Sequence, residues 1–262
     1  MFYFDEIEGK RILKSDLIKN AEAFFTTRDI CICYKSEDIQ NDVQNTIESN
    51  KKIICDSLKI ERGNLLFPTQ THTSHIEIAE KNIKNYPDTD ALVLAEKNLG
   101  IFLNFADCTP IYLYDKQKNI IGNIHSGWQG TIKKIAKHAI IQMKQEFKSN
   151  PKDIVCVIGP TIRKCHFEVQ EDVKNEFYNT FNYMKNIDKI IEFNKNTNSY
   201  FIDTVEINKE LLKEEGILEE NIVDSGICTY CNSSIIHSYR KEGKQAGRNT
   251  ALICISDYMK RL

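Results

Sequence analysis

The stretch ALVLAEKNLGIFLNFADCTPIYLYDKQKNIIGNI, residues 91–124, decides the fold class. It contains four apolar runs of strand length, at residues 91–95, 100–105, 111–114 and 119–124. These runs are continuously apolar rather than alternating, which predicts strands that are buried on both faces. The polar residues between the last two runs predict a tight hairpin over residues 114–119.

Outside this stretch the pattern predicts both further strands and helices. The clearest helix is expected over residues 131–147, where an apolar stripe repeats at helical spacing. Asp203 is the expected N-cap of another helix over residues 205–215, with Glu206 as its capping-box partner. We also expect helices at 50–58 and 171–181, an irregular segment at 31–45, and strands within 1–30 and at 64–67, 153–158, 190–193, 199–202, 235–239 and 251–255.

The order of these elements predicts an α+β fold. Strands bunch between residues 64 and 124 instead of alternating regularly with helices, so a regular parallel α/β sheet is not expected. No Gly-, Ser- or Pro-rich linker divides the chain. We therefore expect a single domain over residues 1–262, with a mixed β-sheet core flanked by helices.

Composition narrows the possible partners. The 262 residues include 35 basic and 37 acidic side chains, a formal net charge of −2, which leaves no footprint for nucleic acid or an anionic membrane. No apolar run approaches the roughly 20 residues of a membrane span, and the first residues do not form a signal peptide. Nine cysteines without such a signal favour reduced thiols in the cytoplasm. We expect small-molecule ligands and a monomer or small homo-oligomer.

Three polar clusters interrupt or end the apolar runs: TQTH at 69–72, ADCTP at 106–110 and NIHSGW at 123–128. Each contributes one metal-binding side chain, namely His72, Cys108 or His125. Three protein ligands with no obvious fourth leave an open position, as in catalytic zinc sites. The same side chains could instead form a hydrolase pair, with Cys108 as nucleophile and His125 as base. Each could also be a structural core residue, and the spacing does not choose.

The surroundings of these clusters suggest anion binding. We expect Pro110 to stop the segment after Cys108, and Gly127 with Gly130 to allow a tight turn before the helix. Free amides at that helix start could hold phosphate. Arginine matches phosphate geometry bidentately, which makes Arg28, Arg240 and Arg248 candidates, although surface ion pairs explain them equally well.

Two further cysteine motifs are interpreted as structural. Cys228 and Cys231 form a C-x-x-C pair, but no second such pair exists and no thioredoxin-like βαβ pattern surrounds it. Cys165 and His166 are adjacent, so on a strand their side chains would point apart.

Taken together, the motifs resemble those of the YfiH family, also called laccase-domain or multicopper polyphenol oxidase proteins. The similarity lies in Thr-Gln-x-His at 69–72, Ala-Asp-Cys-x-Pro at 106–110, His-x-Gly-Trp-x-Gly at 125–130, Gly-Pro-x-Ile at 159–162, Phe-Glu-Val at 167–169 and Ser-Tyr-Arg…Gly-Arg at 238–248. The motifs follow the family order over roughly residues 20–256. The resemblance implies an α+β domain related to toxins of the cytotoxic necrotizing factor type, and zinc bound by His72, Cys108 and His125.

The resemblance also implies a function: phosphorolysis of adenosine, inosine, guanosine and methylthioadenosine with phosphate as co-substrate, plus deamination of adenosine. Asp107 would act as general base or orient a histidine. Gln70 would contact substrate, Trp128 would stack on the purine, and Arg28, Arg240 or Arg248 would hold phosphate. The chain departs from the family pattern after Arg28, where Asp-Ile-Cys replaces Gly-Gly-Val, and at Gln129, where arginine is common.

Two other activities remain open. Some relatives are described as amide hydrolases that edit a peptidoglycan precursor, which would use Cys108 and His125 as a catalytic pair. The older family name implies a copper phenol oxidase, but blue-copper sites usually add an axial methionine, and none of the four methionines lies in these motifs. We rank the nucleoside enzyme first and the oxidase last among the enzymes, and a non-catalytic binding module below all three.

Overall fold

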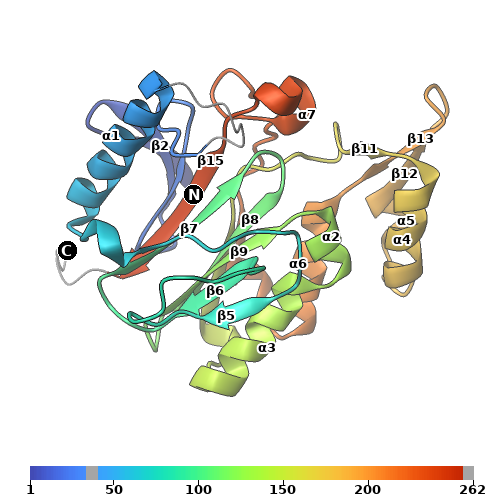
Figure 1. The fold of residues 1–262 in the computed structure, drawn as a ribbon. Coiled ribbons are helices and arrows are strands. Elements are labelled where there is room, and N and C mark those ends of the chain that lie inside the picture. Colours follow the sequence, from blue (N-terminus) through green and yellow to red (C-terminus); the bar gives the residue numbers. More distant parts are fainter. Residues whose placement is uncertain (34–40, 256–262) are drawn as a thin grey trace.

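The computed structural model describes residues 1–33 and 41–255, and its centre is a pair of six-stranded sheets (Figure 1). The first sheet has the order β1 (Phe2–Ile7), β2 (Lys10–Ser15), β3 (Glu22–Thr26), β15 (Asn249–Ile255), β7 (Leu99–Phe105) and β4 (Leu65–Leu66). The second has the order β14 (Ile222–Asp224), β10 (Ile154–Ile158), β8 (Thr109–Asp115), β9 (Ile120–Ser126), β6 (Ala91–Leu94) and β5 (Ile76–Ile78).

Helices cover the outer faces of both sheets. Helix α1 (Asn41–Leu58) lies beside the first sheet, while α3 (Ile135–Phe147) and α6 (Thr204–Glu214) lie on the second (Figure 1). A smaller sheet projects to one side together with α4 (Glu171–Phe181) and α5 (Ile187–Ile190). Its strands are β11 (Glu168–Val169), β13 (Ser199–Ile202) and β12 (Ile191–Asn194). Short helices are α2 (Trp128–Ile132) and α7 (Tyr239–Glu242), with 3₁₀ turns at Arg62–Asn64, Pro151–Asp153, Glu219–Asn221 and Gly243–Gln245.

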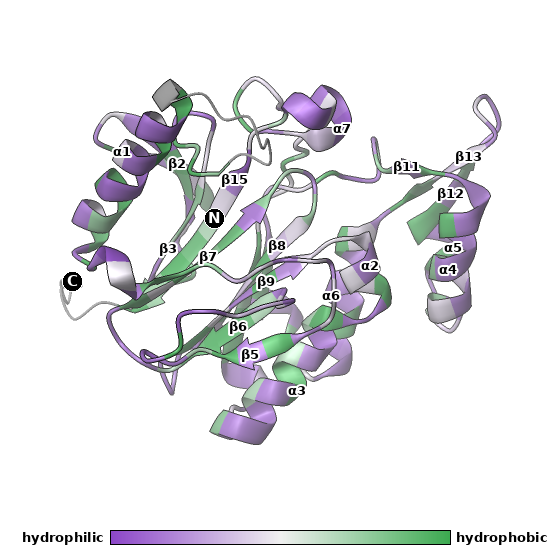
Figure 2. Cartoon of the chain, in the orientation of Figure 1, coloured by the Kyte–Doolittle hydropathy of each residue, from purple (hydrophilic) through white to green (hydrophobic). Residues whose placement is uncertain are grey.

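The main core lies between the two large sheets. Along β7, Ile101 and Leu103 face this core with Tyr112 of β8, whereas Phe102 faces α1. Every residue of β8 and β9 is buried, so the prediction of strands covered on both faces is confirmed. In Figure 2 the strands are largely green and the outer helix surfaces purple, as this layering requires. The expected α+β class is confirmed, and the sheets are mixed because β4, β5 and β14 pair parallel to their neighbours.

One predicted helix is confirmed only from residue 135 onward, and one predicted strand was wrong. The helix expected over 131–147 is divided into α2 and α3, because Lys134 adopts a left-handed conformation with φ 58°. The strand expected at 235–239 is a turn that leads into α7. Its backbone does not join a ladder, because the side-chain amide of Asn249 bonds both the amide and the carbonyl of His237.

One predicted boundary also shifted. Helix α1 begins at Asn41 rather than at residue 50, so part of the segment expected to be irregular is helical. Residues 34–40 of that segment lie outside the described residues. The hairpins at 114–119 and 190–202 are confirmed by the antiparallel pairs of β8 with β9 and of β12 with β13.

Candidate active site

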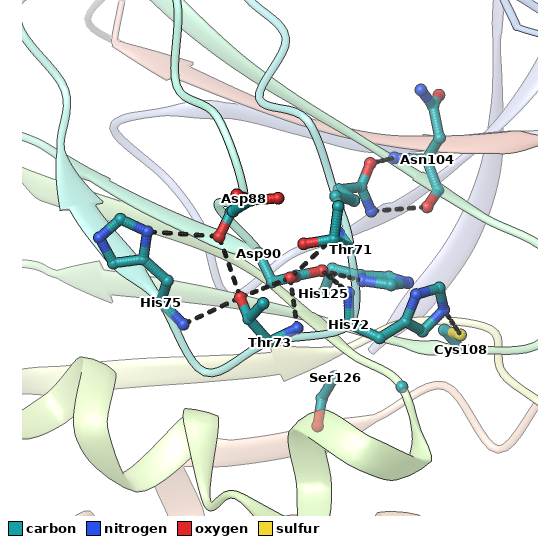
Figure 3. A network of polar contacts seen from close by, with 12 residues as sticks. Thr71, His72, Thr73, His75, Asp88, Asp90, Asn104, Cys108, His125 and Ser126 are labelled. Carbon is teal, nitrogen blue, oxygen red and sulfur yellow. Dashed lines mark hydrogen bonds and ion pairs between the residues drawn. The ribbon is translucent and has the colours of Figure 1, made fainter.

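The three side chains expected to bind a metal converge at the end of the second sheet. One ligand atom from each of His72, Cys108 and His125 lies within 4.8 Å of the others, and Cys108 Sγ is 3.7 Å from His72 Nε2 (Figure 3). Cys108 directly precedes β8, His125 lies in β9, and His72 comes from the loop between β4 and β5. Pro110 does not end its segment: it belongs to β8 and pairs with His125.

Asp90 holds these two histidine-bearing segments together, and sequence analysis did not identify it. Its buried carboxylate lies 2.7 Å from His125 Nδ1 and accepts a hydrogen bond from the backbone amide of His72. The amides of Thr71 and Thr73 donate to the same group, as Figure 3 shows. The signal in the sequence was only an aspartate before the strand β6, without any visible partner.

The buried charges of the site depend on one another. Burial alone would raise the pKa of Asp90, but hydrogen bonds from His125 and Thr73 lower it to about 2. Burial also opposes charge on Cys108 and His125, yet their mutual attraction lowers the pKa of the thiol to about 6 and raises that of the imidazole to about 9. Asp90 adds to the effect on His125. Without a bound cation, the geometry therefore favours a thiolate beside an imidazolium.

The backbone near His72, Cys108 and His125 is unusual at two non-glycine residues. His72 has φ 63° and Asp107 has φ 90°, both in the region that side chains rarely adopt. Gly127 has φ −69°, which any residue adopts, so the expected tight turn does not explain it. The reason is close approach, because a Cβ there would lie 2.8 Å from His72 Cδ2 and 3.1 Å from Cys108 Sγ. The helix that follows has five residues, too few to supply the aligned dipoles of an anion site.

Two pockets meet at Cys108. The larger, about 430 Å³, is lined by His72, Cys108 and His125 together with Cys33, Pro68, Gln70, Asn104, Ala106, Tyr239 and Arg248. The smaller, about 170 Å³, contains Asp107, Trp128, Phe167 and Arg240 in its wall. Both pockets also share Ala106 and Tyr239. The side chains of His72, Cys108 and His125 therefore face a cavity of the size used for small molecules.

The predicted substrate residues are divided between these pockets. Arg248 lines the larger pocket, whereas Arg240 and Trp128 line the smaller one. Gln70 lines the larger pocket, but both ends of its amide bond the backbone of Asn104, which fixes the loop before His72. Arg28 lines neither pocket, because it bonds the carbonyl of Ser233 and pairs with Glu242.

Asp107 is close to the thiol in sequence but bonds a different part of the molecule. Its carboxylate accepts hydrogen bonds from the Thr229 hydroxyl at 2.5 Å and from the Arg240 amide at 2.6 Å. We expected Asp107 to orient a histidine, but the carboxylate that bonds His125 is that of Asp90. Asp107 therefore joins the segment before Cys108 to the chain around residues 229–240.

The donor set fits a borderline metal ion. A thiolate and two imidazoles suit zinc or copper, and three protein ligands leave a position open toward the larger pocket. The hydrogen bond at His125 Nδ1 leaves Nε2 as the donor atom, the common carboxylate–histidine arrangement at metal sites. The space beside Gly127 keeps His72 and Cys108 free of steric contact.

Comparison with known proteins identifies the family. The family described as multi-copper polyphenol oxidoreductase laccase matches residues 22–256, and the chain belongs to it. Purine nucleoside phosphorylase YlmD of Bacillus subtilis is 28% identical over 251 residues, which cover 90% of this chain and 88% of that protein. A purine nucleoside phosphorylase of Clostridium acetobutylicum is 37% identical over 185 residues, covering 70% and 74%.

Solved structures agree with this assignment. The crystal structure of hypothetical protein YfiH from Bacillus licheniformis superposes with a TM-score of 0.85 at 28% identity and covers 96% of this chain and 98% of that one. The resemblance to the YfiH family inferred from the motifs is therefore confirmed.

Within residues 1–33 and 41–255, no helix is both long and apolar enough to cross a membrane.

Proposed function

We propose that this protein is a purine nucleoside phosphorylase that acts in the cytoplasm through a single domain spanning residues 1–262. The observation that carries the proposal is the open set of His72, Cys108 and His125 facing the pocket of about 430 Å³. Family relatives that align over most of this chain bear that name, which supports the same activity here. Adenosine, inosine, guanosine and methylthioadenosine are the proposed substrates.

Aromatic and cationic side chains in the larger pocket would bind the two substrates. Tyr239 is half exposed and lines both pockets, so its ring is available to stack on a purine or pack against ribose. The Arg248 guanidinium lies 5.9 Å from that ring and would hold phosphate next to the nucleoside. Arg240 is the second candidate, because it lines the adjoining pocket rather than the larger one. The guanidinium of each arginine donates to two backbone carbonyls through Nη1, so these contacts do not rank one above the other.

Phosphorolysis requires little covalent chemistry from the protein. A phosphate oxygen forms a bond to C1′ of the ribose while the C1′–N9 bond breaks. The electron pair of that bond passes to the purine, which takes up a proton, and the products are the free base and ribose 1-phosphate. Holding both substrates in line beside the fixed cluster is the main contribution of Arg248 and Tyr239.

Zinc is the metal we propose for the three ligands, and it would supply Lewis-acid chemistry and lower the pKa of bound water. The chain itself favours the thiolate of Cys108 and orients His125 through Asp90. The same site would deaminate adenosine: water adds at C6 of the purine, the exocyclic nitrogen leaves as ammonia, and inosine forms.

A cysteine hydrolase is the second candidate, and a specific observation favours it. Cys108, His125 and Asp90 form a connected series in which the thiol has a pKa of about 6 and the imidazole is oriented by a buried carboxylate. Such a series could attack an amide, including one in a peptidoglycan precursor. A copper phenol oxidase ranks third, because the residues that line the two described pockets include no methionine.

The deciding experiment incubates purified, metal-analysed protein with adenosine, with and without phosphate, and separates the products by chromatography. Adenine and ribose 1-phosphate that appear only with phosphate support the phosphorylase, and inosine in either case supports the deaminase. If zinc-loaded protein leaves adenosine unchanged, the proposal fails. Turnover of an amide that resists chelators but is blocked by thiol reagents would then identify the hydrolase, and copper-dependent phenol oxidation the oxidase.

A further inference from the structure

A second cluster of metal-binding side chains lies outside the proposed active site. It consists of Cys165, His166, Cys228 and Cys231, whose ligand atoms all lie within 4.8 Å of one another. This arrangement contradicts our expectation that Cys165 and His166 point apart on a strand. They lie in a turn, where Cys165 Sγ is 3.2 Å from His166 Nδ1.

The fold brings two distant turns together to form the cluster. Thr161 and Cys228 pair in an isolated parallel bridge, which aligns the segment after β10 with the segment after β14. The amide of His166 bonds the carbonyl of Arg163, closing the first turn, and the amide of Asn232 bonds the carbonyl of Cys228, closing the second. Four side chains from two closed turns are thereby directed at one point.

The distances within the cluster match those of a tetrahedral ion site. Zinc bonds of about 2.3 Å to sulfur and 2.0–2.1 Å to nitrogen place tetrahedral ligands about 3.8 Å apart for two sulfurs and about 3.6 Å for sulfur and nitrogen. Cys165 Sγ lies 3.7 Å from Cys228 Sγ and 3.9 Å from Cys231 Sγ. His166 Nδ1 lies 3.2, 3.4 and 4.0 Å from the sulfurs of Cys165, Cys231 and Cys228.

We propose that Cys165, His166, Cys228 and Cys231 form a second, structural zinc site. All four positions of a tetrahedral ion are filled by protein, so it leaves no place for water or substrate, in contrast to the three-ligand site. A disulfide would use two of the thiols and leave a third thiol and the histidine without a function. Three sulfurs and one nitrogen that all lie within 4.8 Å of one another are what a single shared ion requires.

Neighbouring side chains fit this assignment. The Tyr230 ring stacks on His166 with centroids 4.0 Å apart and planes at 17°, which holds the imidazole in its orientation. The ammonium of Lys241 lies 4.6 Å from the centre of the Tyr230 ring. Zinc with three thiolates carries one negative charge, and this ammonium offsets it.

The site would stabilise one wall of the active site. Thr229 lies between the two cysteines of the second turn and donates to the carboxylate of Asp107, the residue before Cys108. On the other turn, the carbonyl of His166 accepts a hydrogen bond from Arg240, whose own amide also bonds Asp107. An ion that joins the two turns therefore fixes the backbone around Cys108 without touching substrate, which makes its ligands positioning residues.

Metal content measured by mass spectrometry tests the proposal. Wild-type protein should contain two zinc ions per chain, and Cys231→Ser and His72→Ala should each lose one of them, with both lost in the double variant. Cys231 is exposed, so its replacement should not disturb packing. Cys55→Ala is the control: it removes a buried thiol of α1 that belongs to neither cluster, so this variant should retain two ions. A single ion in wild type that Cys231→Ser retains would overturn the proposal.

A second measurement needs no variant of the cluster. Cys165 and Cys231 are exposed, so alkylating reagents can reach both thiols unless a metal holds them. Peptide mapping should find both protected in the protein as purified and modified after chelation. Rapid modification before chelation, or a disulfide among the three cysteines, would contradict the site. Neither measurement uses a nucleoside, so failure of the phosphorylase activity leaves this test intact.

Cobalt gives a spectroscopic check in a protein that lacks the first site. In the His72→Ala background, added Co²⁺ should produce the intense visible bands of tetrahedral thiolate coordination. Adding Cys165→Ser should weaken them strongly. Bands that persist unchanged in that double variant would show that cobalt binds elsewhere.

Discussion

Asp90 connects both histidines of the candidate active site through one buried carboxylate. Replacing it by asparagine keeps the size of the side chain but removes the charge that His125 Nδ1 faces at 2.7 Å. We expect Asp90→Asn to weaken metal binding about 10- to 100-fold, the usual effect of losing a hydrogen-bonded partner of a histidine ligand. Competition against a chelator of known affinity measures this change.

Asp88 offers a matched control for that substitution. It lies two residues before Asp90, its side chain is exposed, and its φ of 47° is one that asparagine adopts readily. Asp88→Asn should bind metal like the wild type. If the Asp88→Asn and Asp90→Asn proteins bind metal with equal affinity, Asp90 does not support metal binding.

Gly127 matters because of the space it leaves open. A methyl group there would meet His72 and Cys108 at distances that real Cβ atoms avoid, so Gly127→Ala must displace one of the two ligands. A displacement of this kind costs on the order of 100-fold in kcat/KM, and the melting temperature should change little. In Gly63→Ala the added methyl meets nothing within 4 Å, so that variant should be fully active. Full activity of Gly127→Ala would refute this explanation.

The side chains that we propose to perform chemistry were easier to find in the sequence than those that support them. His72, Cys108 and His125 were identified because each polar residue type stands out at the end of an apolar run. Asp90 was missed because its partners are distant in the sequence, and nothing local distinguishes a buried aspartate from an exposed one. Arg28 illustrates the opposite error: its charge suggested phosphate binding, whereas Glu242, far along the chain, neutralises it.

At the level of elements, helix α6 shows a predicted cap that is half confirmed. Asp203 accepts a hydrogen bond from the amide of Glu206 at 3.0 Å, as expected of an N-cap. The reciprocal half of the capping box is not needed, because the amide of Asp203 donates to the carbonyl of Ile190 instead. Asp203→Ala should therefore lower the free energy of unfolding by about 1 kcal/mol in urea denaturation.

Asp203→Asn distinguishes the capping hydrogen bond of Asp203 from an effect of its charge. Asparagine caps helices about as well as aspartate, so Asp203→Asn should stay within a few tenths of a kcal/mol of the wild type. An equal loss in both variants would mean that charge, not the hydrogen bond to Glu206, stabilises the start of α6.

The predicted helices and strands were wrong where side-chain contacts, rather than the periodicity of apolar residues, determine the backbone conformation. The apolar stripe continues from residue 132 to 147, so nothing in it reveals the left-handed Lys134 that separates α2 from α3. Residues 235–239 are sufficiently apolar for a strand, but the side chain of Asn249 bonds the backbone of His237. The amides of Ile235 and Ile236 bond the carbonyl of Asn232, which closes a turn. The cysteine cluster was missed for a related reason, since its two turns are distant in the sequence and the bridge between Thr161 and Cys228 brings them together.

For the whole molecule, the class of fold was predictable and the division into two sheets was not. Continuous apolar runs required strands covered on both faces, which implies layers. However, β15 pairs with β3 at one end of the chain and with β7 near the middle. Such contacts depend on which strands meet during folding, and no local pattern in residues 249–255 specifies either partner.

Tyr112 joins the two sheets and allows the proposal of a single domain to be tested. Its buried hydroxyl, on β8, donates to the carbonyl of Phe24 on β3 at 2.6 Å, and its ring stacks on Phe25. Tyr112→Phe leaves that carbonyl without this donor, so the free energy of unfolding should fall by roughly 1–2 kcal/mol. The exposed Tyr3 is the control, and Tyr3→Phe should have no measurable effect.

Urea unfolding of the Tyr112→Phe protein can be followed by Trp128 fluorescence and by far-UV circular dichroism, which report on different parts of the molecule. Trp128, the single tryptophan, packs against the cluster that contains α4, whereas far-UV circular dichroism reports on the whole backbone. If one cooperative domain unfolds, the Tyr112→Phe substitution shifts the urea midpoints of both probes equally, because the layers cannot separate without breaking the shared core. A shift in circular dichroism with an unchanged Trp128 transition would instead divide the chain into two independently unfolding units.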